Sequence, residues 1–275
     1  MKEAVFANGK ILAPGQARVS ALAPGFLCAY ALFETMRSYD NKIIYFDRHL
    51  NRIKKSSQLM GINFPHRQQR VKKIIKELVK IVGLEDVYIR LTLYKSEGGA
   101  DILIIAKKYH PPALRVYKKG FCANISRFRQ NDCFLAKLKT TNRILYELGF
   151  REARRKGFDE AIILNNRGLI TEASRSNIFF VKDKAIFTPS LECGCLEGIT
   201  RGLVFDWAKK YNLKIYNGNY TLKDLYAADE AFLTNSLMGI MPLAFVENRV
   251  IGKGSDNRIT RYFIKKYNFL LKNGS

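Results

Sequence analysis

The residues of this chain best suited to chemistry are a lysine, a glutamate and a glycine at the start of an expected helix. Lys139 stands in AKLKTTNRILYELG (136–149), between an extended segment and a helix expected to begin near Thr141 or Asn142. A lysine at such a junction is partly desolvated, which lowers its pKa and leaves a neutral amine that can attack a carbonyl group. Lys137 is a rival for this role by position alone. The pattern thus predicts a nucleophilic amine near residue 139.

The carboxylate is Glu172, which lies in GLITEASRSNIFF (168–180) between an apolar strand and a turn of small residues. Such a glutamate can simply stabilise a turn or cap a helix. Beside a bound heteroaromatic ring, a carboxylate can instead pair with a protonated ring nitrogen and make the ring an electron sink. Glu172 is therefore the second candidate for a chemical role.

The glycine belongs to TPSLECGCLEGITR (188–201), in which Gly198-Ile199-Thr200 opens a helix expected over 199–211. The first N–H groups of a helix have no partner within the helix, and the helix dipole is positive at that end. Such a terminus binds phosphate without a special side chain, and the Thr200 hydroxyl can add one more donor. This segment predicts a phosphate site.

In this order and spacing, the three segments resemble the fold-type IV pyridoxal-phosphate enzymes, which include branched-chain and D-amino-acid aminotransferases and 4-amino-4-deoxychorismate lyase. The resemblance implies pyridoxal 5′-phosphate as the cofactor, and the cofactor carries the chemistry. In this family two residues and an asparagine follow the cofactor-binding lysine, so KTTN (139–142) selects Lys139 over Lys137. A glutamate ahead of S-x-S-N matches Glu172 and SRSN (174–177).

The same resemblance assigns two further sets of residues. One set binds the cofactor, mainly through its phosphate: Arg52, Ile199, Thr200 and Ser236. The other set contacts the substrate: Phe33, Lys95 and Asn142. The chain departs from the family pattern on the substrate side, because Ala29 and Ala31 replace the usual glycines. Lys95 replaces an arginine found in many relatives, which keeps the charge and loses the bidentate fork.

The motifs favour one reaction within the family and leave a second open. LTNSLMGIMPL (233–243) is closer to the T-N-S-x-x-x-I-x-P of the lyases than to the S-G-T-A-x-E-I-x-P of the aminotransferases. We therefore expect an aminodeoxychorismate lyase, which releases pyruvate and leaves 4-aminobenzoate for folate synthesis. A branched-chain or D-amino-acid aminotransferase is the alternative. In both reactions the Lys139 amine would act as the general base.

Composition limits the other classes of function. The chain has 275 residues, 47% of them hydrophobic, with no apolar run long enough to span a membrane and no signal peptide at MKEAVFANGK. Five scattered cysteines indicate free thiols, and three isolated histidines argue against a metal site with four ligands. We therefore expect a cytoplasmic protein without a metal ion.

The net charge of +23 raises the question of nucleic acid as a partner. The basic residues, however, are spread along the whole chain and often fall on the polar faces of amphipathic helices. No aromatic-rich RNA-binding motif accompanies them. We therefore expect a solvated lysine-rich surface and a small amino substrate, with no nucleic acid and no membrane as partner.

The elements expected to position these residues form a mixed α/β protein with two domains. Val71, Ile74, Ile75, Leu78, Val79 and Val82 follow helical spacing, and apolar strands are expected at 86–95 and 101–106. His110-Pro111-Pro112 interrupts this pattern and predicts a linker between domains 1–112 and 113–275, the second carrying most of the cofactor site. The resemblance implies a D-amino-acid-aminotransferase-like fold and a homodimer.

Overall fold

The computed structural model describes residues 3–131, 133–252 and 257–273, and the chain divides into two units. Unit 1 consists of Met1–Pro111, Leu138–Asn142 and Leu270–Ser275; unit 2 consists of Pro112–Lys137 and Arg143–Phe269. The predicted boundary after residue 112 lies beside this division. The predicted domains 1–112 and 113–275 differ from these units in one respect. Two short segments after residue 112, Leu138–Asn142 and Leu270–Ser275, belong to unit 1.

The sheet of unit 1 has six antiparallel strands in the order β2-β1-β6-β5-β3-β4. Their bounds are β1 Glu3–Ala7, β2 Lys10–Leu12, β3 Ala31–Tyr39, β4 Lys42–Ile43, β5 Asp86–Ser96 and β6 Gly99–Lys108. Asn8 and Gly9 join β1 to β2 with φ angles of 52° and 76°, as a type I′ turn requires. β3 is the strand that matters for the site, because it pairs with β5 along its whole length.

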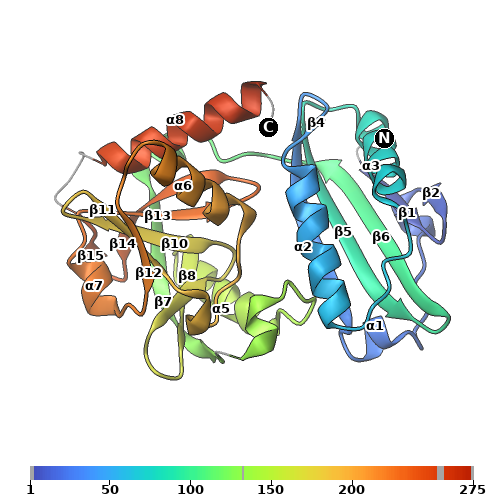
Figure 1. The fold of residues 1–275 in the computed structure, drawn as a ribbon, viewed down its shortest axis with the longest axis horizontal. Helices are drawn as coiled ribbons and strands as arrows, with labels where there is room; N and C mark the ends of the chain where they lie inside the picture. Colours follow the sequence, from blue (N-terminus) through green and yellow to red (C-terminus); the bar gives the residue numbers. More distant parts are fainter. Residues whose placement is uncertain (1–2, 132, 253–256, 274–275) are drawn as a thin grey trace. The chain divides into compact units, whose positions relative to one another are not determined.

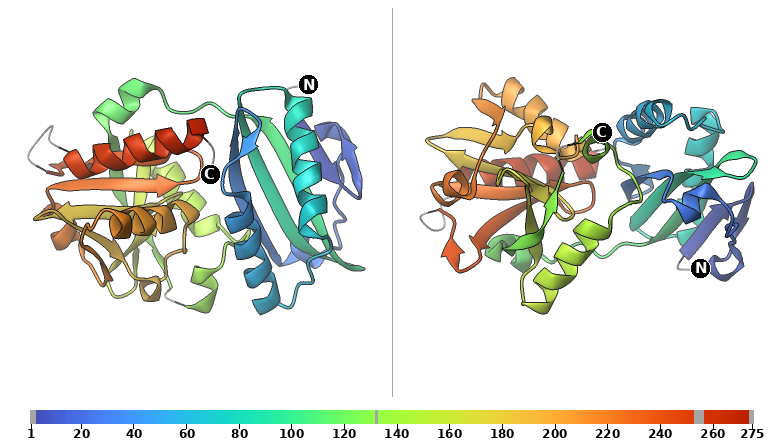
Figure 2. Two further views of the ribbon diagram at one scale, coloured as in Figure 1. Left: turned by 45° about the horizontal axis from the view of Figure 1, so that its top comes forward. Right: turned by 90° about the horizontal axis from the view of Figure 1, so that it is seen from below.

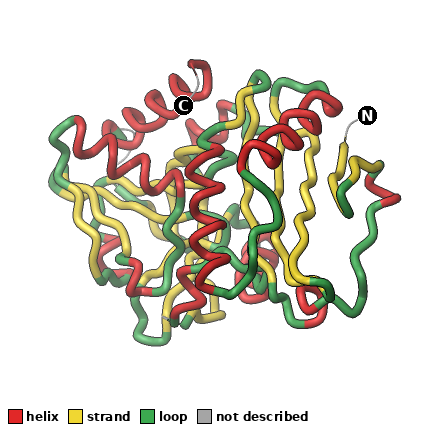
Figure 3. Tube along the Cα trace, turned by 45° about the vertical axis from the view of Figure 1, so that its right-hand side comes forward, coloured by secondary structure: helices red, strands yellow, loops and turns green. Residues whose placement is uncertain are grey.

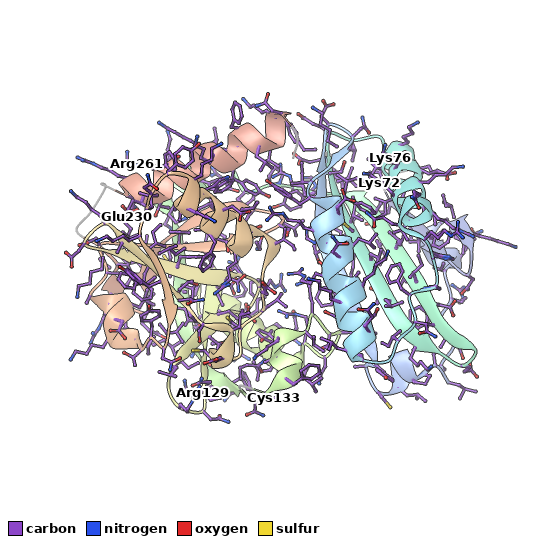
Figure 4. The ribbon with its side chains drawn as sticks, in the orientation of Figure 1. Lys72, Lys76, Arg129, Cys133, Glu230 and Arg261 are labelled. Atoms are coloured by element: carbon purple, nitrogen blue, oxygen red, sulfur yellow. The ribbon has the colours of Figure 1, made fainter. Side chains whose placement is uncertain are left out.

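Two long helices, α2 (Phe46–Leu59) and α3 (Gln68–Val82), cover one face of this sheet (Figures 1, 2 and 3). Two short helices, η1 (Pro14–Gln16) and α1 (Pro24–Leu27), precede β3. All six apolar residues of the predicted α3 stripe are buried against the sheet. Lys73, Lys76 and Lys80 of α3 are exposed, whereas Lys72 is half-buried, with its Nζ 5.3 Å from the centroid of the Phe46 ring. Figure 4 shows Lys72 and Lys76 on this helix. This helix therefore has the solvated basic face that its sequence predicted.

Unit 2 is built on a mixed sheet of nine strands. Eight of them follow the order β12-β11-β10-β13-β14-β7-β8-β9, and β15 pairs with β14. Their bounds are β7 Phe121–Gln130, β8 Glu160–Asn165, β9 Ile170–Ala173, β10 Asn177–Lys182, β11 Ala185–Pro189, β12 Ile215–Gly218, β13 Glu230–Asn235, β14 Gly239–Val246 and β15 Arg249–Val250.

One face of the second sheet holds an apolar core that includes Ile162, Ile178, Leu233 and Met241. The helices of the unit are α4 Leu114–Lys119, η2 Phe134–Lys137, α5 Ile144–Arg155, η3 Leu191–Cys193, α6 Ile199–Lys210, α7 Leu222–Tyr226 and α8 Arg258–Asn273. α4 and α7 pack against that core, whereas α5, α6 and α8 contact strands from the opposite face. The candidate site of unit 2 lies on this opposite face.

A buried glutamate fixes α8 on the sheet. The carboxylate of Glu230, at the start of β13, accepts the backbone N–H groups of Ile259 at 3.1 Å and Thr260 at 2.8 Å. Figure 4 labels Glu230, at the start of β13, and Arg261, which follows Thr260 on α8. Because α8 is anchored there, the Phe263 ring packs against Phe232, with ring centroids 5.7 Å apart. This packing supports β13, the strand that leads to Ser236.

Candidate active site

Lys139 is held by the main chain of unit 1 rather than by a helix. The residues around it pair with the free side of β3: Phe33 donates its N–H to the Lys139 carbonyl at 2.9 Å, and Thr141 donates to Ala31 at 3.0 Å. An antiparallel bridge joins Leu32 and Thr140 between them. Residues 134–137, expected to be extended, form the short helix η2, because the chain becomes strand-like only where it meets β3. The backbone of Lys139 is therefore fixed by a sheet edge.

The side chain of Lys139 is half-buried, whereas its rival Lys137 is exposed. Its Nζ lies 4.5 Å from the centroid of the Phe33 ring. The guanidinium carbon of Arg90 lies 3.8 Å from the same centroid, so the Phe33 ring contacts two cationic groups. Of the other predicted substrate residues, Asn142 is exposed, and Lys95 is half-buried with its N–H bonded to the Tyr30 carbonyl at 3.0 Å. Both belong to unit 1 with Lys139 and Phe33.

Arg52, predicted to bind phosphate, makes a two-pronged ion pair with Glu34 of β3. Its Nε donates to Oε1 at 2.7 Å and its Nη2 to Oε2 at 2.6 Å. His49 Nδ1 lies 2.6 Å from Oε2, and both Glu34 and His49 are about 1% exposed. This buried triad joins α2 to β3, and no motif in the sequence predicted it. The phosphate role of Arg52 stays a prediction, with two of its donors directed at Glu34.

The triad has clear protonation states. Burial by itself would raise the pKa of Glu34, but the charge of Arg52 and the hydrogen bond from His49 outweigh it and lower the pKa to about 2. Burial lowers the pKa of His49, and the hydrogen bond to Glu34 offsets this only in part. His49 is therefore a neutral imidazole that donates its Nδ1–H to an ionised carboxylate.

We expect acid to destabilise unit 1 in two stages. The folded pKa of His49 lies below the unfolded value of about 6.5, so stability falls as the pH drops below about 6.5. The Glu34 contribution, on the order of 3 kcal/mol, is present above about pH 4.3 and is lost as the pH falls toward 2. Urea unfolding between pH 8 and about pH 4 measures the first stage. His49→Gln keeps a donor for Glu34 and should remove that stage. If the free energy of unfolding of this variant depends on pH as it does in the parent, His49 is not the group that titrates in the first stage.

Glu172, on β9 of unit 2, is 5% exposed and accepts hydrogen bonds on both carboxylate oxygens. The Tyr146 hydroxyl of α5 donates to Oε1 at 2.9 Å. The Asn177 Nδ2 and the Leu196 N–H each donate to Oε2 at 3.2 Å. Donors that converge on a buried carboxylate favour its charged form, which is the form that pairs with a protonated ring nitrogen. The position of Glu172 was predicted from the sequence, whereas its contact with Tyr146 was not.

A second buried carboxylate shapes the turn that follows Glu172. Glu160 accepts the Ser174 hydroxyl, the Arg175 N–H at 3.2 Å and the Ser176 hydroxyl at 3.3 Å. Burial raises its pKa. Because this turn connects Glu172 to Asn177, Glu160 fixes the spacing between the two residues. Nothing in the sequence signals this role, since Glu160 lies at an ordinary strand start.

The N-terminus of α6 lies against the same asparagine. Asn177 Nδ2 donates also to the Leu196 carbonyl at 2.8 Å, and Gly198 is the N-cap residue of α6. A Cβ atom added at Gly198 would meet Asn177 Oδ1 at 2.0 Å. The helix start can approach this side chain only because residue 198 is a glycine. Unit 2 thus brings Glu172 and the predicted phosphate residues Ile199 and Thr200 together through Asn177.

Two polar atoms near this helix start fit an anionic ligand. Arg201 Nε and Thr234 Oγ1 are buried and make no hydrogen bond within the part of the chain that the structure describes. Thr234 pairs with Asn177 across β10 and β13, and Ser236 follows it after one residue. A buried donor without a partner costs free energy, which a bound phosphate would offset. The donors near the start of α6 therefore fit the phosphate of pyridoxal phosphate, and the Glu172 carboxylate fits its protonated ring nitrogen.

We expect Gly198→Ala to weaken pyridoxal-phosphate binding by about ten- to a hundredfold. The added methyl group would displace Asn177, which links Glu172 to the start of α6, and a hydrogen bond to a charged group contributes roughly 1.5–3 kcal/mol. Titration of the apoprotein with the cofactor, followed by absorbance, gives the affinity. Gly15→Ala is the control, because nothing lies within 4 Å of a Cβ at that position. Parental affinity in Gly198→Ala would show that Asn177 is not needed in its present position.

Other classes of site find no support in the described residues. No group of three His, Cys, Asp or Glu among residues 3–131, 133–252 and 257–273 could hold a metal ion. All five cysteines are free thiols. In the same ranges, no helix combines the length and the apolar character that crossing a bilayer requires.

Comparison with known proteins points in one direction. A family model described as amino-transferase class IV matches residues 31–245. A putative branched-chain-amino-acid aminotransferase of Methanocaldococcus jannaschii is 29% identical over 273 residues, covering 96% of this chain and 94% of that protein. Aminodeoxychorismate lyase of Bacillus subtilis is 28% identical over 263 residues, covering 91% of this chain and 89% of that protein.

Solved structures agree with these matches. The branched-chain aminotransferase of Thermoproteus uzoniensis with norvaline is 29% identical, with a TM-score of 0.88 over 98% of this chain and 94% of that one. The T.th. branched-chain amino acid aminotransferase with pyridoxamine 5′-phosphate is 25% identical, with a TM-score of 0.89 over 98% and 93%. The predicted mixed α/β fold of the fold-type IV enzymes is therefore confirmed.

Proposed function

The chain belongs to the class IV amino-transferase family, which uses pyridoxal phosphate, and within this family we propose that it is an aminodeoxychorismate lyase. The predicted relationship to the fold-type IV enzymes and the predicted cofactor are confirmed by the family match. The choice of reaction within the family rests on the turn after β13.

This turn is built by the side chain of Asn235, the middle residue of the lyase-like TNS. Its Oδ1 accepts the N–H groups of Leu237 at 3.0 Å and Met238 at 2.9 Å, and its Nδ2 donates to the Arg175 carbonyl at 3.2 Å. The aminotransferase motif S-G-T-A has a glycine at this place, which has no side chain to make these bonds. The lyase-like sequence therefore determines the conformation of the turn that carries Ser236, and this observation supports the lyase.

The cofactor, when bound, supplies a ring that withdraws electrons from the substrate carbon. The Glu172 carboxylate would hold a proton at the ring nitrogen. The N–H groups at the start of α6 and the Thr200 hydroxyl would bind the phosphate. The Lys139 amine would remove the proton from the carbon that bears the substrate nitrogen, acting as the general base. For a lyase the enolpyruvate group then leaves, and aromatisation of the remaining ring drives the reaction.

An aminotransferase is the second candidate, and one observation favours it. The relatives from Methanocaldococcus jannaschii and Aquifex aeolicus, the latter 30% identical over 95% of this chain, are both named as branched-chain-amino-acid aminotransferases. The first steps at Lys139 and Glu172 would be the same. The two reactions differ in whether the substrate carries a leaving group, so the assay has to compare substrates.

The discriminating experiment offers purified protein, loaded with pyridoxal phosphate, two sets of substrates in parallel. Aminodeoxychorismate alone should give 4-aminobenzoate and pyruvate in equal amounts. Branched-chain or D-amino acids with 2-oxoglutarate should give little glutamate. Glutamate formation without 4-aminobenzoate would replace the lyase by the aminotransferase. A protein that fails in both assays, while it binds the cofactor, would exclude both reactions.

We further propose that the protein acts as a homodimer, and unit 1 offers a surface for the contact. Leu22, Phe26 and Leu27 are 68%, 69% and 63% exposed, and such a group of large apolar side chains is typical of an interface. The aromatic side chains Phe33 and Phe46 offer no such surface, because both are buried in unit 1 itself.

Sedimentation equilibrium at low and high salt should give about twice the monomer mass of 31.5 kDa. The net charge of +23 per chain opposes association, so high salt should strengthen the dimer. Replacing Phe26 and Leu27 by serine should shift the equilibrium toward the monomer, whereas the same change at exposed Leu114 should not. An active monomer at both salt concentrations would contradict the proposal.

A further inference from the structure

We propose that Tyr146, supported by Gln130, is a positioning residue that holds the Glu172 carboxylate ionised and oriented toward the ring nitrogen of the cofactor. The inference rests on the proposed cofactor-binding role of Glu172. It adds two residues to which the sequence analysis assigned no role, Tyr146 from α5 and Gln130 from the end of β7.

The three side chains form a directed relay. The Gln130 Nε2 donates to the Tyr146 hydroxyl oxygen at 2.9 Å, and that hydroxyl lies 2.9 Å from Glu172 Oε1. A hydroxyl has one proton to donate, and an amide nitrogen cannot accept it. With Gln130 as donor to the hydroxyl oxygen, the proton of Tyr146 points at Glu172. A hydroxyl that accepts one bond also donates more strongly in the next.

Tyr146 is well placed to keep this role. It is 7% exposed and packs with Ala153, Ala161 and Ile163 between α5 and β8. Burial and the charge of Glu172 raise its pKa, so the hydroxyl stays protonated. The Arg143 guanidinium carbon lies 4.1 Å from the Tyr146 ring centroid and packs against the ring. The hydroxyl therefore acts as a permanent neutral donor.

The other charged or titratable groups near Glu172 act differently. Arg201 interacts with Glu172 through its charge, in the direction that favours a carboxylate. Cys195 is held as a neutral thiol, because burial and the charge of Glu172 raise its pKa to about 12. Asn177 and Leu196 both donate to Oε2. Tyr146 donates instead to Oε1. Its loss would remove a hydrogen bond that stabilises the charge on this buried oxygen.

The test follows the ionisation of Glu172 directly in the apoprotein. Carboxyl groups labelled with ¹³C at glutamate are titrated by NMR, and Glu172→Gln identifies the Glu172 signal. In Tyr146→Phe we expect protonation of Glu172 to occur about one to two pH units higher than in the parent, since a hydrogen bond to a charged group is lost. Gln130→Ala should move it in the same direction by less. Tyr117→Phe is the matched control, because the Tyr117 hydroxyl binds the Met238 carbonyl at 2.7 Å instead.

The outcomes separate this inference from the proposed function. An unchanged Glu172 titration in a folded Tyr146→Phe protein overturns the inference, whatever the activity. If Tyr146→Phe does not fold, Gln130→Ala decides in the same way. A shifted titration together with a weakened absorbance band of the bound cofactor supports the inference. A shifted titration in a protein whose Glu172→Gln variant retains full turnover overturns the ring-nitrogen role of Glu172 instead.

Discussion

Lys139→Ala is expected to lower turnover by on the order of a thousandfold or more and to abolish covalent attachment of pyridoxal phosphate. The change removes the amine that we propose both bonds to the cofactor and acts as the general base, and each of these roles contributes several orders of magnitude on its own. Non-covalent binding should survive, because the residues proposed to hold the cofactor lie in unit 2: the phosphate donors at Thr200 and the start of α6, and the Glu172 carboxylate as acceptor for the ring nitrogen.

Borohydride reduction followed by peptide mass analysis identifies the modified lysine. The parent protein should carry the cofactor at Lys139, and Lys137→Ala should behave like the parent, since Lys137 is exposed at the end of η2. Cofactor trapped at Lys137, or substantial turnover in Lys139→Ala, would show that the register taken from KTTN is wrong.

Glu172→Gln is expected to lower turnover at least about a hundredfold with a much smaller loss of cofactor affinity. Glutamine has nearly the same shape and can still accept the bonds from Asn177 and Leu196 with its one oxygen. It has no negative charge, so it does not hold a proton at the ring nitrogen. Its amide nitrogen would also face the Tyr146 hydroxyl, which already accepts a bond from Gln130.

Cofactor titration and steady-state kinetics measured on the same preparation separate the two effects. Glu147→Gln is a suitable control: this glutamate lies on α5, its side chain is 50% exposed, and it pairs with Arg175 at the surface. The control should have parental kinetics. A Glu172→Gln protein with normal turnover would remove Glu172 from the ring-nitrogen role and would leave the phosphate site at α6 untouched.

Local patterns in the sequence predicted the elements well where one element decides the outcome. The α3 stripe from Val71 to Val82 is buried because helical spacing gathers it on one face. The Asn8-Gly9 turn follows from residues that accept positive φ. The helix start at Gly198 was also predicted from local sequence; this glycine is the N-cap residue of α6, with a φ angle of −70°.

The interactions that were not predicted join residues far apart in the chain. Glu34 meets Arg52 because α2 packs on β3, and Tyr146 meets Glu172 because α5 packs over β8 and β9. Neither pair follows from a period or a motif, because each contact depends on how a helix is placed on a sheet. Family resemblance supplied Lys139 and Glu172, and the structure supplied the residues that surround them.

The return of Leu138–Asn142 to the edge of β3 has a consequence for how the protein is made. When the first 111 residues have left the ribosome, the side of β3 around Leu32 still lacks the strand-like segment that will satisfy it. An unpaired strand edge is a template for wrong pairing and aggregation. This edge of β3 can be paired only after residues 139–141 have emerged, and the segment that pairs with it also carries Lys139, the proposed cofactor-binding lysine.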